Sequence, residues 1–155
     1  MLKSHLIYGV TASVKHYIGV GSDKLTRTAH RSVGAGGMAT GMAETRAPVL
    51  NVIDAIWINA NPGRGPSTRY SDASRVGTIA AGRDPVALDY WAAKNILLPA
   101  AQKLGYRNTD SLDPDNTRTG SFGNWLRLSM EELQRAGYAS TLELDSVNVI
   151  VSPFR

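Results

Sequence analysis

Two polar side chains near the start of the chain, His5 and Lys15, have residue types and a spacing suited to chemistry. Lys15 follows Thr11 by four residues on an expected short helix, so its amine can reach back toward the end of the preceding strand. A lysine held there could neutralise an anion or, once desolvated, attack a carbonyl carbon. His5 could act as a general acid or base near neutral pH. The plainer alternatives are an exposed lysine on a surface helix and a structural histidine.

Three loops are expected to converge on this crevice, because ligands of parallel sheets bind beyond the carboxyl ends of the strands. They are the turn and helix of residues 5–15, the loop of residues 63–65, and the turn of residues 83–84. Glycines there let backbone approach a ligand, and arginines can hold an anion. The cofactor itself stays unknown, with a metal or a phosphate-bearing group as the candidates. The predicted cofactor-binding residues are Thr11, Gly63, Arg64, Gly65, Arg83 and Asp84.

The remaining histidines differ in what they could contribute to the crevice. His30 lies in the basic, glycine-rich segment 19–41 and is a candidate metal ligand or lid residue, the alternative being simple exposure. His16 points roughly 100° away from Lys15 on a helix, so the two cannot face one pocket.

Asp89 is an anomaly of a different kind. It is surrounded by apolar residues in an expected helix, so its carboxylate needs a buried partner, and we favour a structural hydrogen bond over catalysis. Asp84 is explained by capping that helix. Asp54, inside an apolar strand, likewise needs a partner or a place at the strand end.

Charge is distributed unevenly along the chain. The net charge is +4, and residues 1–70 hold eight Lys and Arg against three Asp and Glu, whereas the remainder holds nine against ten. A local basic field favours a small anionic ligand, although a solvated basic face is the simple alternative. Basic clusters interleaved with exposed aromatic residues are absent from the sequence, which disfavours nucleic acid as the partner.

Composition excludes several classes of site and location. The chain contains no cysteine, so it holds no disulfide, no Cys-ligated zinc and no iron–sulfur cluster. No apolar run reaches the roughly twenty residues that span a bilayer, and the amino terminus lacks a signal-peptide pattern. We therefore expect a cytoplasmic protein without membrane contact. Walker-type, Gly-x-Gly-x-x-Gly, His-Glu-x-x-His and Gly-x-Ser-x-Gly motifs do not occur.

The elements that must position these residues alternate between strands and helices. Such alternation predicts a single α/β domain over residues 1–155, with a layered, mostly parallel sheet flanked by helices. The run 49–58 is apolar almost throughout, which is typical of a strand covered on both faces. We expect strands over 2–8, 49–58, 75–81 and 147–151, helices over 11–18, 38–47, 85–98 and 122–136, and loops over 19–41, 59–66 and 106–121.

Several segments together resemble the bacterial and archaeal family catalogued as domain of unknown function 362. They are residues 2–5, Gly9-Val10-Thr11 with Lys15, 52–54, 63–66, and the most specific, residues 82–89. The similarity covers roughly residues 1–97. Many members of that family carry a ferredoxin-type iron–sulfur module, which this cysteine-free chain lacks, so an iron–sulfur protein is a candidate partner.

The resemblance also implies that the chain corresponds to the carboxy-terminal half of the family domain. A sheet that is incomplete on its amino-terminal side leaves an edge and apolar surface uncovered, which favours a homo-oligomer or a partner subunit.

A weaker resemblance connects the chain to the nickel-pincer lactate racemases. By that similarity His5 would transfer the proton, Lys15 would join the pincer nucleotide covalently, and His30 would ligate the metal. The register is imperfect: His30 falls one place early, and Ala12, Ser13 and Val14 replace the glycines that precede the racemase lysine.

Three hypotheses for the function follow. The first is an enzyme domain that binds an anionic or metal-containing cofactor in the His5 and Lys15 crevice, with His30 at its margin. The second is a non-catalytic module that docks with a redox or other partner through its sheet edge. The third is an incomplete domain without activity of its own.

Overall fold

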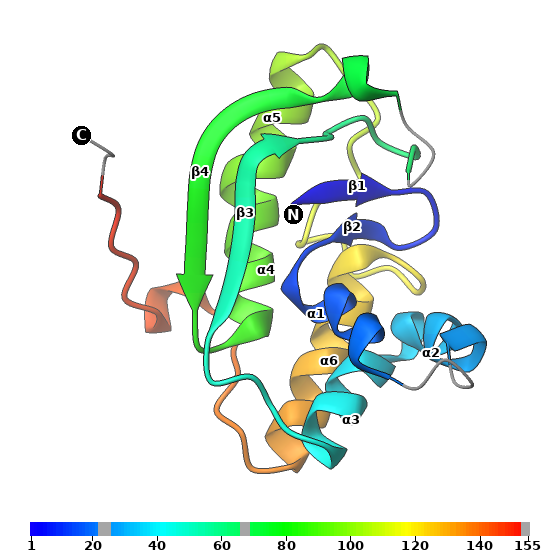
Figure 1. Cartoon of the computed structure of the whole chain (residues 1–155), viewed down its shortest axis with the longest axis vertical. Helices are drawn as coiled ribbons and strands as arrows, with labels where there is room; N and C mark the ends of the chain where they lie inside the picture. Colours follow the sequence, from blue (N-terminus) through cyan, green and yellow to red (C-terminus); the bar gives the residue numbers. More distant parts are fainter. Residues whose placement is uncertain (22–25, 66–68, 153–155) are drawn as a thin grey trace.

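The computed structural model describes residues 1–21, 26–65 and 69–152 (Figure 1). Helices and strands are mixed in it, so the predicted α/β composition is confirmed. In chain order the elements are β1 (Lys3–His5), β2 (Gly9–Thr11), α1 (Ser13–His16), η1 (Tyr17–Val20), α2 (Thr26–Ser32), η3 (Val33–Ala35), α3 (Gly37–Glu44), β3 (Asn51–Ile58), η4 (Tyr70–Asp72), β4 (Ser74–Gly82), α4 (Pro85–Ala92), the π-helical η5 (Ala93–Leu97), α5 (Leu98–Lys103), α6 (Phe122–Arg135) and η6 (Leu144–Ser146).

Both strand pairs are antiparallel, so the predicted parallel sheet is wrong. β1 pairs with β2, and β3 pairs with β4. The two pairs meet through one isolated parallel bridge between Lys3 and Asn59. A parallel neighbour requires a crossover, usually a helix, whereas the described part of the β3–β4 connection contains only the single turn η4. The chain therefore returns antiparallel.

The amino-terminal segment forms a hairpin where a strand followed directly by a helix was predicted. Gly9 turns the chain with a φ of +73°, and a Cβ at this position would lie 1.9 Å from the carbonyl oxygen of Ser111. Only glycine fits such an approach. The indole Nε1 of Trp125 on α6 donates to the carbonyl of Tyr8 at 2.9 Å, which fixes the turn against α6.

The glycine-rich segment after α1 is largely helical, so the predicted loop over residues 19–41 is wrong where the structure describes it. α2, η3 and α3 follow one another there. Met38, Ala39 and Met42 are buried, and a Cβ at Gly36 would lie 2.9 Å from the backbone of Leu128 on α6. Packing against α6 thus outweighs the low helix propensity of glycine. α3 ends at Glu44, ahead of Pro48 as predicted.

The β3–β4 pair is covered on one face only. α4 and α5 run along the inner face (Figure 1), where Ile53, Ala55 and Ala80 are buried. The outer face exposes Val52, Trp57 and Ile79. The prediction that residues 49–58 are buried on both faces is therefore wrong.

The helices of the second half begin where the sequence predicts. Asp84 caps α4, accepting from the backbone N–H of Val86 at 2.9 Å, and Pro85 occupies the first helical position. Ser121 caps α6 in the same way, accepting from Asn124 at 3.2 Å. Gly137, with a φ of +85°, follows the end of α6.

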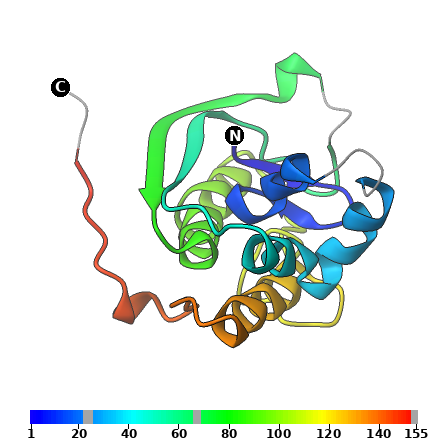
Figure 2. The same ribbon diagram turned by 60° about the horizontal axis from the view of Figure 1, so that its bottom comes forward.

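Residues 147–151 form no strand among the described residues. They follow η6 as an extended segment that stands apart from the helices (Figure 2). The Val and Ile content favours a strand, but no neighbouring strand is hydrogen-bonded to this segment in the described part. No described helix combines the length and apolar character needed to cross a membrane.

Candidate functional site

The β1–β2 hairpin places three polar side chains on one face. Lys3 is directly opposite Thr11, and His5 lies two residues further along β1. Side chains two residues apart on a strand share a face, as do directly paired residues. We call Lys3, His5, Tyr8, Thr11 and Lys15 the Lys15 cluster.

Lys15 is buried, with 6% of its surface exposed, and no ion pair to it exists among the described residues. Its Nζ lies 5.5 Å from the centroid of the Tyr8 ring, within the range of a cation–π interaction. Burial lowers the pKa of Lys15 below its ordinary value, and the charge of Lys3 lowers it further. Both effects disfavour the ammonium form, because burial removes part of its hydration and the positive charge of Lys3 repels it.

His5 is held as a neutral imidazole. Its Nδ1 accepts from the backbone N–H groups of Ile7 at 3.1 Å and Tyr8 at 3.2 Å. Burial lowers the pKa of His5 to about 4, and the charges of Lys15, Lys3 and His30 act in the same direction. Because Nδ1 is an acceptor in both bonds, the proton of the neutral ring is on Nε2. His5 therefore presents a hydrogen-bond donor to its surroundings.

Thr11 has an unsatisfied polar atom. The residue is 3% exposed, and its Oγ1 is a buried side-chain oxygen with no hydrogen-bond partner in the described part of the chain. Orphaned buried hydroxyls are rare because desolvation without a compensating bond costs about 1–3 kcal/mol. The hydroxyl is free to donate to a bound group.

The loop of Gly63, Arg64 and Gly65 lies against β1. Ser4 Oγ donates to the carbonyl of Asn61 at 2.6 Å and to that of Arg64 at 3.1 Å. A Cβ on Gly65, where φ is +109°, would lie 2.9 Å from the carbonyl oxygen of Ser4. The Arg64 side chain is exposed. Pro66, the next residue of the predicted motif, lies outside the described residues.

The backbone of His30 contacts the Lys15 cluster. The Tyr8 hydroxyl donates to the His30 carbonyl, and the Tyr8 ring lies 5.2 Å from that of His5, so Tyr8 contacts three of the predicted site residues. The His30 side chain is exposed. The described residues include no group of three or more His, Asp or Glu side chains arranged to hold a metal ion. The role of His30 as a metal ligand stays a prediction.

Arg83 and Asp84 face a different part of the surface. Both line a groove of about 1620 Å³ formed by β4, the start of α4, the end of α6 and residues 146–152. The Asp84 carboxylate also accepts from Ser140 Oγ at 2.9 Å and from the backbone N–H of Thr141 at 2.8 Å. Its role is to cap α4 and to hold the carboxy-terminal segment. None of the Lys15 cluster lines that groove.

Sequence reasoning missed Lys3, Ser4 and Tyr8. Strand alternation could have identified Lys3, because it shares a face with His5. No local pattern marks Tyr8, since its role depends on contacts with α1 and with residue 30.

The buried and strand-borne carboxylates are satisfied as expected. Asp89 is fully buried and hydrogen-bonded, which confirms the predicted structural bond. Asp54 is exposed on β3 and accepts from the backbone N–H of Ile56 at 2.9 Å.

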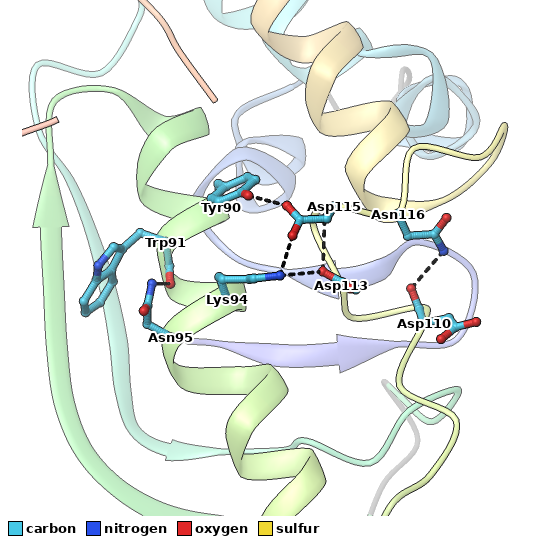
Figure 3. A network of polar contacts seen from close by, with 8 residues as sticks. All are labelled: Tyr90, Trp91, Lys94, Asn95, Asp110, Asp113, Asp115 and Asn116. Atoms are coloured by element: carbon cyan, nitrogen blue, oxygen red, sulfur yellow. Dashed lines mark hydrogen bonds and ion pairs between the residues drawn. The ribbon is translucent and has the colours of Figure 1, made fainter. Parts of the chain in front are cut away.

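A second polar cluster connects α4 and η5 to the loop 106–121 (Figure 3). Lys94 contacts the carboxylates of Asp113, at 3.3 Å, and Asp115, at 2.5 Å, and the hydroxyl of Tyr90 donates to Asp115. Lys94 thus neutralises the carboxylates of Asp113 and Asp115, and these contacts hold the loop 106–121 against α4 and η5.

The family model of a domain of unknown function (DUF362) matches residues 1–94, close to the stretch over which the resemblance was expected. A search of curated proteins and a search of solved structures returned no match. The resemblance to lactate racemases is therefore not shown, and the match does not say which half of the family domain the chain represents.

Proposed function

This chain belongs to the DUF362 family, and on that premise we propose that its Lys15 cluster binds the anionic group of a small ligand or cofactor. The observation that carries the proposal is the buried residue Lys15, whose amine has no carboxylate partner among the described residues. A buried cation without a counter-ion is costly, and an anion would remove that cost.

The neighbours of Lys15 support an anion rather than a cation. Lys3 adds a second positive charge, as its effect on the pKa of Lys15 indicates. His5 offers Nε2–H, and Thr11 offers an uncommitted hydroxyl. Charges and donors of this kind suit the oxygens of a phosphate or carboxylate. Arg64, which is exposed in the loop that contacts β1, is our candidate for a second anionic group of the same ligand.

Binding of a metal-containing cofactor would require His30 as a ligand, a role that the proposed anion site does not need. His5 Nδ1 is engaged as an acceptor, so a metal would have to displace the proton from His5 Nε2. Binding of an anion by Lys15 requires no such change.

The test is calorimetric titration of the protein with phosphate, sulfate and small carboxylates. We expect Lys15→Met to weaken binding by tenfold or more, since a hydrogen bond to a charged group contributes about 1.5–3 kcal/mol. Lys103→Met, which removes an exposed lysine of α5, is the matched control and should bind as the parent does. Equal affinity in the parent and in Lys15→Met, or no binding of any of these anions by the parent, would refute the proposal.

A second candidate function, docking through the β3–β4 sheet, is favoured by its uncovered outer face. Val52, Trp57 and Ile79 are 57%, 55% and 48% exposed there. Among the described strands, β4 pairs only with β3, which leaves its other edge open. We propose a second copy of the chain as the occupant, because an antiparallel edge can pair with its own symmetry mate.

Light scattering coupled to size exclusion tests this docking. We expect a concentration-dependent dimer in the parent and a monomer for Ile79→Lys, which places a charge on the outer face. Thr117→Lys, at an exposed position of the loop 106–121, is the control for added charge. A parent that is monomeric across the accessible concentration range would contradict the second candidate and leave the anion site unaffected.

A further inference from the structure

Asp89 of α4 points at the amino terminus of α1, the short helix that carries Lys15. Its Oδ1 accepts from the backbone N–H of Ser13 at 2.7 Å and also contacts the Ser13 hydroxyl, while its Oδ2 accepts from the backbone N–H of Val14 at 2.9 Å. The Ser13 hydroxyl lies 3.3 Å from the Pro85 carbonyl as well. Both carboxylate oxygens are thus used to bind one turn of helix.

α1 has no cap of its own. The residue at its capping position is Ala12, which makes no side-chain hydrogen bond to the first turn. A helix of this length is not stable alone, because the first turn is costly to nucleate and its N–H groups lack partners. Asp89 supplies from another helix what Ser, Thr or Asp normally supplies locally. The position of α1, and with it that of Lys15, depends on this contact.

We propose that Asp89 is a positioning residue for Lys15: it holds α1 against α4 and thereby keeps the Lys15 side chain beside Tyr8 and β1. One part of this inference rests on the proposed function, namely that Asp89 affects the affinity for anions. The other part, that the surroundings of Lys15 depend on Asp89, follows from the hydrogen bonds between Asp89 and α1 and does not require an anion site.

The free-energy cost of burying the Asp89 carboxylate supports a role other than overall stability. Burial raises the pKa of Asp89 to about 7, and the hydrogen bonds from Ser13 and Val14 offset only part of that rise. The charged groups that face it are the carboxylate of Asp84, which raises the pKa further, and the amino group of Met1, whose own pKa responds to Asp89. A buried carboxylate of this kind is a weak source of stability, so its contribution is the placement of α1.

The test compares Asp89→Asn with Asp145→Asn, an exposed matched control. Asparagine keeps the size of the side chain but places an amide donor against one of the two backbone N–H groups, so one bond to α1 is lost. The pH profile of Lys15 acetylation, followed by peptide mass mapping, reports its pKa. We expect the midpoint to move upward in Asp89→Asn toward the value of an exposed lysine, and the affinity for sulfate to fall about tenfold. Ser13→Ala keeps both backbone bonds and should shift the midpoint less.

Two outcomes separate this inference from the proposed function. A Lys15 midpoint that is the same in Asp89→Asn, Asp145→Asn and the parent, with unchanged amide exchange at Ser13 and Val14, overturns the positioning role whether or not sulfate binds. A shifted midpoint in a parent that binds no anion supports the positioning role and refutes the proposed function. If Asp89→Asn fails to fold, Ser13→Pro decides by the same midpoint, because proline is tolerated at the first helical position but removes the Ser13 N–H from which Asp89 accepts. A shift in Ser13→Pro supports the role, and none overturns it.

Discussion

The amine of Lys15 lies 5.5 Å from the centroid of the Tyr8 ring, and this contact joins the hairpin turn to the helix α1. The Tyr8 ring also lies 5.2 Å from the His5 ring at a tilt of 36°, and its hydroxyl donates to the His30 carbonyl. A single aromatic side chain thus brings together residues that are distant from one another in the sequence.

Replacement of Tyr8 should separate the effect of its ring from that of its hydroxyl. Tyr8→Phe keeps the ring beneath the Lys15 amine and should bind anions as the parent does. Tyr8→Leu removes the ring and with it a cation–π contact of about 0.5–2 kcal/mol, which stabilises the ammonium form. The pKa of Lys15 should therefore fall in Tyr8→Leu, and anions should bind more weakly. The Lys15 acetylation profile and sulfate calorimetry measure both. Equal behaviour of the two variants would show that the ring has no role.

Gly9 should tolerate no side chain. Gly9→Ala places a Cβ 1.9 Å from the Ser111 carbonyl oxygen at a φ of +73°. Gly105 has a similar φ, +85°, but no atom within 4 Å of a Cβ, so Gly105→Ala measures the backbone cost alone, about 1–2 kcal/mol. Chemical denaturation should show a much larger loss of unfolding free energy for Gly9→Ala. Equal losses would mean that the approach to Ser111 relaxes freely.

His5 should make the protein less stable in acid. Its pKa is lowered to about 4 in the folded state from an ordinary value of 6.5, so between these values the unfolded state binds more protons. Stability should therefore fall as pH falls from about 6.5 to 4. Asp89 acts in the opposite sense, because its raised pKa removes stability as pH rises toward 7.

A variant comparison isolates the contribution of His5. His5→Asn retains an acceptor near the N–H groups of Ile7 and Tyr8 but does not titrate. The difference in unfolding free energy between the parent and His5→Asn should therefore change between pH 6.5 and 4. A difference that is constant over this range would contradict the neutral, buried imidazole.

Lys94 should affect the local stability of the loop 106–121 and not the anion affinity of the Lys15 cluster. Its ion pairs with Asp113 and Asp115 are a third to a half exposed, so Lys94→Met should cost no more than about 1 kcal/mol. Amide exchange in residues 110–118 should accelerate, while sulfate affinity stays that of the parent. A loss of affinity in Lys94→Met would show that this second cluster communicates with the Lys15 cluster.

Local signals predicted much of the second half of the fold. Asp84 and Pro85 mark the start of α4, and Gly137 follows the end of α6, because capping and helix termination depend on neighbouring residues. The glycine-rich segment was misjudged because contacts with α6, far along the chain, stabilise its helices. Strand direction was misjudged for a comparable reason, since apolar runs do not reveal whether the chain crosses over or returns.

The candidate site was predictable in part. Residue type and spacing identified His5 and Lys15, and the loop with Arg64 does lie against β1. Arg83 was grouped with them because a parallel sheet would bring its turn to the same edge, and the antiparallel pairing places it on the groove beside β4 instead. The contact of Asp89 with α1 joins residues 75 and 76 positions apart, which no local pattern encodes.

The most direct measurement of the central claim is the NMR signal of the Lys15 side-chain amine during titration with sulfate. Binding at the Lys15 cluster predicts a saturable shift of that signal, with a midpoint equal to the calorimetric dissociation constant and no comparable shift for Lys103. A Lys15 signal that stays unchanged while sulfate binds elsewhere, or while none binds, would contradict the account.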